Sequence, residues 1–173
     1  MAYKFLGGVL HSADTLAAIF NPTVNSYKRI DAQVTSSGAT WSPNAITYGG
    51  NNQTHMLRVP DVGRFKMRLM DGAVNPYLLQ AGILAAGLDG VANDRDPGNP
   101  SSLNMYTEGH KATGVRRLPS NLLDAIRLFE KSKVLRATLG NELVDSYAKL
   151  KHQDWRSYSA AISQWERDNT LDC

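Results

Sequence analysis

Residues 77–91 predict a helix that is apolar on almost every side. Asn75 and Pro76 form a typical helix start, because an asparagine side chain caps free backbone amides and proline suits the first helical position. A helix without a polar face packs among other elements, so we expect it to be central and buried. The near-apolar run of residues 77–88 contains Gln80 and is too short to span a bilayer.

The segments before this helix predict another helix and several strands. Residues 5–20 carry apolar side chains at three- and four-residue spacing, and a proline ends that helix. The polar residues 21–53 predict a loop with one or two short strands, for example at residues 45–48. Better strands follow at residues 56–59 and 64–70. The second one alternates between two sets of side chains, Phe65, Met67 and Leu69 on one face and Arg64, Lys66 and Arg68 on the other.

The segments after the apolar helix predict further helices. A polar loop at residues 93–118 leads to a helix capped by Ser120, and a short helix from Ser132 ends at Gly140. A last long helix starts at Asn141, and its apolar side consists of Leu143, Val144, Tyr147, Leu150, Tyr158, Ala161 and Ile162.

Length and composition fit one folded domain over residues 1–173, because 42% of the residues are hydrophobic and 20% are charged. We predict the α+β class, with a few antiparallel strands and a mainly helical C-terminal half. The net charge of +3 permits an anionic ligand without arguing for nucleic acid. The only cysteine, Cys173, excludes an intrachain disulfide and fits a reducing cytoplasm. No segment resembles a signal peptide or a transmembrane helix, so we predict a cytoplasmic protein.

The most informative residues are basic, and they are Lys28, Arg29, Arg58, Arg64, Lys66 and Arg68. A strand places alternate side chains about 6.6 Å apart, so the last three form a row. Guanidinium groups bind carboxylate and phosphate with paired hydrogen bonds, and a row that faces a cleft would hold an anion. The alternative is a solvated strand face that keeps an edge charged. A nucleic-acid-binding module is disfavoured, because no aromatic residue interleaves the cations.

Other site chemistry lacks a supporting pattern. The four histidines, His11, His55, His110 and His152, show no metal-binding spacing, so no metal site is predicted from them. The chain contains neither a Gly-x-Ser-x-Gly element nor a phosphate-binding glycine loop. Three aromatic residues at helical spacing predict packing rather than base stacking, namely Trp155, Tyr158 and Trp165.

Five stretches closely resemble the glutamine synthetase family and follow its order. They are NPTVNSYKR at residues 21–29, LRVP at 57–60, RLMDGAVNPYL at 68–78, AAGLDG at 85–90 and WERDNTLD at 165–172. The chain is most similar to a branch with type III-labelled glutamine synthetases and γ-glutamylmethylamide synthetases. The resemblance runs from about residue 3 to the C-terminus and identifies the C-terminal portion of a catalytic domain.

This resemblance implies a reaction and a set of site residues. In the family, ATP phosphorylates the γ-carboxylate of glutamate, ammonia or a small amine displaces the phosphate, and Mg²⁺ or Mn²⁺ bridges the phosphates. By similarity, Arg29 and Arg68 would bind glutamate, whereas Arg58 and Arg64 would meet the ATP phosphates. Fixed positive charge suits a step that brings a carboxylate against a polyphosphate.

The chain departs from the family pattern at three places. Gln53 stands where the family has an arginine that contacts phosphate, and Lys66 stands where it has a glutamate that binds a metal ion. A protonated lysine does not ligate a divalent cation and repels it. The family's flap glutamate has no clear counterpart in residues 30–35.

The resemblance also implies that the family's N-terminal domain and the first half of its catalytic domain lie outside these 173 residues. Those parts carry a Glu-x-Glu metal pair and a His-x-His-x-Ser nucleotide segment. We therefore expect a partial ligase domain that is inactive alone. The alternative is a non-catalytic interaction protein, because the family assembles into rings. Such a chain would form a homo-oligomer or join full-length synthetase subunits, and an uncovered apolar surface would favour this association.

Overall fold

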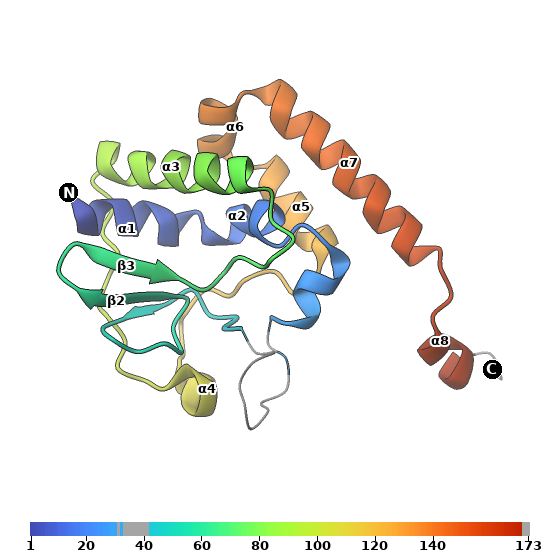
Figure 1. Cartoon of the computed structure of the whole chain (residues 1–173), viewed down its shortest axis with the longest axis horizontal. Coiled ribbons are helices and arrows are strands. Elements are labelled where there is room, and N and C mark those ends of the chain that lie inside the picture. Colours follow the sequence, from blue (N-terminus) through green and yellow to red (C-terminus); the bar gives the residue numbers. More distant parts are fainter. Residues whose placement is uncertain (31, 33–41, 171–173) are drawn as a thin grey trace.

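The computed structural model describes residues 1–30, 32 and 42–170, and Figure 1 shows their arrangement. In chain order the elements are α1 (Ala2–His11), α2 (Ala13–Phe20), the 3-10 helix η1 (Val24–Lys28), β1 (Tyr48–Gly49), β2 (Leu57–Asp61), β3 (Arg64–Met67), α3 (Pro76–Ala92), α4 (Met105–Glu108), the 3-10 helix η2 (Gly109–Lys111), α5 (Leu122–Glu130), α6 (Lys133–Leu139), α7 (Asn141–Ser159) and α8 (Gln164–Thr170). The predicted α+β class with a mainly helical C-terminal half is confirmed.

The three strands form one small sheet in the order β1-β2-β3. The strands β2 and β3 pair antiparallel, with Arg58 opposite Lys66 and Leu57 opposite Met67. The strand β1 pairs with β2 in parallel, which differs from the antiparallel arrangement that we predicted. The predicted strand over residues 64–70 stops at Met67, although the Arg68 amide still donates to the Met56 carbonyl at 2.8 Å.

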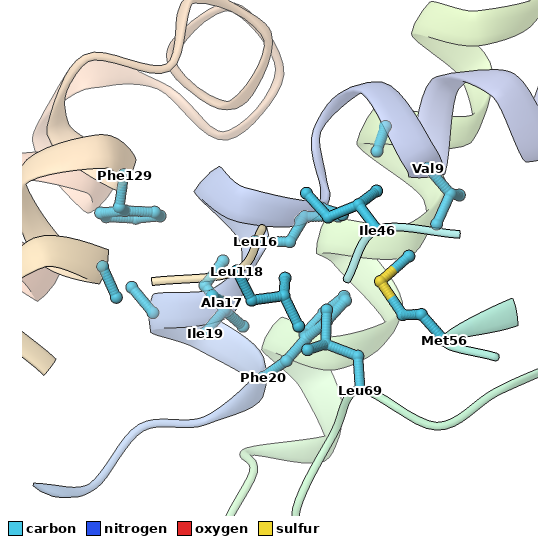
Figure 2. Packing of buried hydrophobic residues seen from close by; sticks show 14 of the residues in the cluster. Val9, Leu16, Ala17, Ile19, Phe20, Ile46, Met56, Leu69, Leu118 and Phe129 are labelled. Carbon is cyan, nitrogen blue, oxygen red and sulfur yellow. The ribbon is translucent and has the colours of Figure 1, made fainter. Parts of the chain in front are cut away.

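Helix α1 lies between α3 and the β2–β3 hairpin, as Figure 1 shows. Its contact with α3 depends on small residues, because a Cβ atom on Gly8 would lie 2.1 Å from the Ala86 carbonyl oxygen. On the sheet side, the rings of Phe5 and Phe65 lie 5.9 Å apart. Figure 2 shows how helices and connecting segments contribute side chains to the core, in which Leu16, Phe20, Met56 and Leu69 are fully buried.

The predicted helix over residues 5–20 is two helices that meet at Ser12. The Arg116 guanidinium donates from Nη2 to the carbonyls of Leu10, at 2.5 Å, and His11, at 3.0 Å. Backbone carbonyls at the end of α1 therefore have a partner more than one hundred positions away. Such a long-range contact leaves no trace in the local apolar spacing.

The prediction that α3 is buried on all sides is wrong. Its buried residues are small ones, Gly82, Ala85, Ala86, Gly87 and Gly90, and they face the neighbouring helices. Tyr77, Leu84 and Leu88 are 82%, 54% and 58% exposed. The predicted start is correct, because the Asn75 side chain accepts hydrogen bonds from the Tyr77 and Leu78 amides.

Several predicted boundaries in the C-terminal half are correct. Ser132 caps α6, and Gly140 follows it with a φ of 85° that favours glycine. The cap of α5 is Asn121 rather than Ser120, because its side chain accepts from the Asp124 amide at 2.9 Å. The short helices α4 and η2 lie within the segment that we predicted as loop.

The last long helix ends earlier than predicted, at Ser159. Of its expected apolar side, Val144 is buried and Tyr147 packs on Phe129 with ring centroids 5.3 Å apart, whereas Leu150, Tyr158 and Ile162 are exposed. Trp155 packs against the core as predicted, but Trp165 in α8 is 68% exposed. Figure 1 shows α7 and α8 extending from the body of the molecule. No helix in the described ranges is long and apolar enough to cross a bilayer.

Candidate anion-binding site

The six site residues suggested by the sequence come from three neighbouring segments. Arg29 directly follows η1, and Gln53 lies in the loop before β2. The other four residues belong to the β2–β3 hairpin or follow it directly, namely Arg58, Arg64, Lys66 and Arg68. Gln53, Arg64 and Lys66 are exposed, whereas Arg29, Arg58 and Arg68 are half-buried.

Arg58 and Lys66 lie on the same face of the hairpin, because residues directly opposite each other in paired strands point the same way. Alternation places Arg64 and Arg68 on this face as well. The opposite face packs on the core through Leu57, Phe65 and Met67. The cationic row of the sequence is therefore one surface of the sheet, directed away from the core.

Arg68 is held in place by backbone groups. Its Nη1 donates to the Gln53 carbonyl at 2.5 Å, and its own carbonyl accepts from the Ser42 hydroxyl at 3.3 Å. Both partners are uncharged, so the positive charge of Arg68 remains available to a ligand. Gln53 thus contacts Arg68 through its backbone carbonyl, a contact that does not depend on the type of side chain at position 53.

Arg29 lies beside Arg68. Its Nη2 donates to the Asn21 side-chain oxygen and to the Leu69 carbonyl, each at 3.1 Å. Burial lowers the pKa of Arg29; the charge of Asp71 opposes this shift, and the charge of Arg68 adds to it. Arg29 is therefore within electrostatic reach of both Asp71, which attracts it, and Arg68, which repels it.

The cations of this region form no ion pair within the described part of the chain, although Asp71 acts on Arg29 through its charge and Asp61 lies opposite Arg64 in the hairpin. None of the described ion pairs includes Arg29, Arg58, Arg64, Lys66 or Arg68. By contrast, seven lysine and arginine residues elsewhere each pair with a carboxylate: Lys4, Arg95, Lys111, Arg116, Arg127, Arg136 and Lys151. Within the described residues, the Nε atoms of Arg29 and Arg58 are buried without a hydrogen-bond partner. Buried donors of this kind are costly unless a ligand satisfies them.

Asn21 is a site residue that the sequence analysis did not identify. The sequence analysis included it in the NPTVNSYKR stretch without giving it a role, yet its side chain is fully buried and contacts the Arg29 guanidinium. The signal that could have revealed it was its place at the start of the NPTVNSYKR stretch, eight positions before Arg29. The flap segment of residues 30–35 lies mostly outside the described residues.

A divalent metal ion, which the family resemblance implies, does not fit the described part of this site. Apart from Asp61, which lies opposite Arg64, the charged side chains on the hairpin face are guanidinium and ammonium groups, which donate hydrogen bonds and do not ligate cations. The described residues contain no group of three or more His, Cys, Asp or Glu side chains that could hold a metal ion. Lys66 adds a further positive charge to the face.

A cavity of about 980 Å³ lies in another part of the molecule, and none of the six site residues lines it. It is bordered by the end of α1 and by loop residues around Arg95 and Arg116. Both arginines are paired, Arg95 with Asp89 at 2.5 Å and Arg116 with Asp14 at 3.2 Å. Size alone would favour this cavity, but the cations that take part in no described ion pair gather on the hairpin face, and we assign the candidate site there.

His55 is buried close to the site but contributes no charge to it. Its Nδ1 lies 2.9 Å from the Thr47 hydroxyl, and its Nε2 is buried without a partner. Burial lowers the pKa of His55, so the neutral form prevails at neutral pH. The residue packs against Gly49, where any side chain would collide with its ring.

Comparisons with known proteins identify relatives of the chain. The family model described as the catalytic domain of glutamine synthetase matches residues 1–170. The glutamine synthetase of Rhizobium leguminosarum bv. phaseoli is 58% identical over 168 residues, 97% of this chain. The glutamate–methylamine ligase of Methyloversatilis universalis is 43% identical over 175 residues. The chain spans 39% of the length of each of these relatives.

A solved structure supports the same assignment. It is described as an ADP complex of GmaS, and it superimposes with a TM-score of 0.92 at 55% sequence identity. The match covers 99% of this chain and 40% of that chain. Agreement in family model, sequence and structure leads to one conclusion: the chain belongs to the glutamine synthetase family and corresponds to part of its catalytic domain.

Proposed function

We propose that this chain supplies the glutamate-binding and phosphate-binding arginines of a glutamine synthetase-type ligase. The family reaction is the ATP-dependent amidation of glutamate by ammonia or a small amine, through γ-glutamyl phosphate. The observation that carries the proposal is the pair Arg29 and Arg68, two neighbouring cations whose described partners are uncharged. This pair lies within the segment that the family model matches.

The proposed roles follow from charge and position. Arg29 and Arg68 hold a carboxylate of glutamate, because paired guanidinium groups match the geometry of carboxylate oxygens. Arg58 and Arg64 receive the phosphates of ATP from the adjacent part of the same face. Phosphoryl transfer to a carboxylate builds negative charge, and fixed cations stabilise that charge without reorganising during the reaction.

We further propose that the isolated chain is inactive. The chain corresponds to about two fifths of its relatives, and Lys66 is unsuited to hold the Mg²⁺ or Mn²⁺ that accompanies ATP in the family. The test is phosphate release by the purified chain with ATP, Mg²⁺, glutamate and either ammonia or methylamine. We expect no release above the protein-free control, and turnover at an enzyme-like rate would refute the inactivity.

Glutamate binding tests the assigned arginines separately from turnover. In a calorimetric titration without nucleotide, Arg68→Gln should weaken glutamate binding at least about tenfold, because a charge-assisted hydrogen bond contributes about 1.5–3 kcal/mol. Arg127→Gln is the matched control, since Arg127 is exposed and pairs with Asp124 on α5, far along the chain from the site. Equal affinity in both variants, or no glutamate binding by the unaltered chain, would remove the substrate assignment.

A second candidate function is association with itself or with full-length synthetase subunits. The observation favouring it is the exposed apolar set on α7, α8 and their connection: Leu150, Tyr158, Ile162 and Trp165. An arm of this composition gains stability by packing against another protein. Co-purification with a full-length synthetase would support this function. A monomer that fails to bind a synthetase would exclude it.

We propose the cytoplasm as the location of this function. Two points support this location: the only cysteine is Cys173, which fits a reducing compartment, and ATP and glutamate are the proposed reactants.

A further inference from the structure

The β2–β3 hairpin face carries four cations, of which Arg58 and Lys66 are a directly opposed cross-strand pair. Like charges directly opposite each other on a sheet are destabilising. No described carboxylate pairs with either residue, and the Nε of Arg58 is buried without a partner. The fold therefore maintains a local repulsion that an anion between the two side chains would relieve.

Lys66 determines which form of anion the face accepts. Phosphate groups complexed with a divalent metal ion bring positive charge with them, and the exposed Lys66 ammonium would repel that ion. Free phosphate groups keep their full negative charge and can accept hydrogen bonds from both the ammonium and the guanidinium group. The charge pattern thus favours a metal-free ligand over its metal complex.

We propose that the part of the hairpin face around the opposed pair Arg58 and Lys66 binds a polyphosphate group without a divalent metal ion. This inference deepens the proposed function, since it concerns the phosphate-binding part of the same site. Only the identity of the natural ligand rests on that function. Lys66 supplies the charge that a metal ion would otherwise provide. The result is an anion-binding surface that does not need magnesium.

The probe is inorganic pyrophosphate, titrated into the full 173-residue chain by calorimetry, once with EDTA and once with excess Mg²⁺. The unaltered chain should bind pyrophosphate in EDTA, and Mg²⁺ should leave the affinity unchanged or lower it. Lys66→Glu should weaken binding in EDTA at least about tenfold, because it replaces an attractive charge with a repulsive one. Added Mg²⁺ should then restore part of the affinity of this variant.

Lys133→Glu is the matched control, because it makes the same charge change at an exposed position in the first turn of α6. It should keep the affinity of the unaltered chain. An equal loss in both variants would show non-specific attraction and overturn the proposal. The same holds if the unaltered chain binds only with Mg²⁺, or if Lys66→Glu binds normally in EDTA.

Two further measures keep the result interpretable. Circular dichroism checks that the variants fold, and Lys66→Gln serves if Lys66→Glu does not. Its affinity in EDTA should also fall, without recovery on addition of Mg²⁺, and an unchanged affinity would overturn the proposal. The glutamate titration uses no phosphate, so its failure would remove the substrate assignment while the pyrophosphate result still stands.

Discussion

Tyr147 fills a hydrogen-bonding gap that a proline creates in another helix. The Ala18 carbonyl lies in the last turn of α2, and the residue four positions later, just beyond the helix, is Pro22, which has no N–H to donate to it. The Tyr147 hydroxyl of α7 donates to this carbonyl at 2.8 Å. One hydrogen bond therefore links two helices that are 129 positions apart at this contact.

Replacing Tyr147 with phenylalanine should leave the Ala18 carbonyl without its partner while keeping the ring beside Phe129. A polar group left unsatisfied in this way costs about 1–3 kcal/mol. Tyr27→Phe is the matched comparison, because its hydroxyl donates to the Ala17 carbonyl at 3.2 Å, which also accepts from the Asn21 amide at 2.8 Å. Its loss should stay near 0.5–1.5 kcal/mol, roughly the net value of one hydrogen bond.

Urea unfolding measures both variants, with the midpoint reporting stability and an unchanged slope confirming comparable transitions. For a domain of this size, about 1 kcal/mol corresponds to a shift of about 2–4 °C in Tm. A loss in Tyr27→Phe equal to or larger than that in Tyr147→Phe would refute the reasoning, since it would mean that the proline gap is not what makes Tyr147 important.

Three further predictions concern the same fold. Burial raises the pKa of Tyr27 and Tyr147 above their ordinary value of 10.0, because the folded protein favours the neutral phenols. The stability that the neutral phenols contribute is complete below pH 10 and is lost as the pH rises towards the folded-state pKa. In the double phenylalanine variant, the urea midpoint should therefore fall less steeply above pH 10 than in the unaltered chain. Gly8→Ala should cost about 3 kcal/mol or more, because its Cβ would lie 2.1 Å from a backbone oxygen of α3, whereas Gly50→Ala has no neighbour within 4 Å and should stay within about 0.5 kcal/mol by urea unfolding. Asn121→Ala removes the cap of α5 and should cost about 1 kcal/mol in the same assay, and no loss would contradict the assigned cap.

Local patterns in the sequence predicted the elements that local forces determine. The alternation of Phe65 and Met67 with Arg64 and Lys66 predicted β3 and its two faces, because one face is packed and the other is not. Asn75 and Pro76 predicted the start of α3, since capping involves only the first turn. These features depend on side chains within a few positions of each other.

Contacts between distant segments account for what the sequence did not reveal. The end of α1 at His11 depends on a guanidinium from Arg116, and the parallel pairing of β1 depends on the path of the intervening loop. The exposed side of α3 was missed because apolar composition does not indicate which faces find a partner. Family resemblance suggested Arg29 and Arg68 as site residues, but only the structure brings Asn21 and the Gln53 carbonyl beside them.

The charge arrangement of the hairpin separates binding from catalysis. The guanidinium groups of Arg58 and Arg68 are hydrogen-bond donors that suit a phosphate oxygen. A divalent metal ion needs oxygen ligands, whereas the Lys66 ammonium group is a hydrogen-bond donor and cannot ligate it. In the function that we propose, the same face attracts phosphate but lacks a metal ion to activate it. If the pyrophosphate titration shows binding and the turnover assay shows no phosphate release, Lys66 accounts for both results, because it attracts phosphate and repels the metal ion.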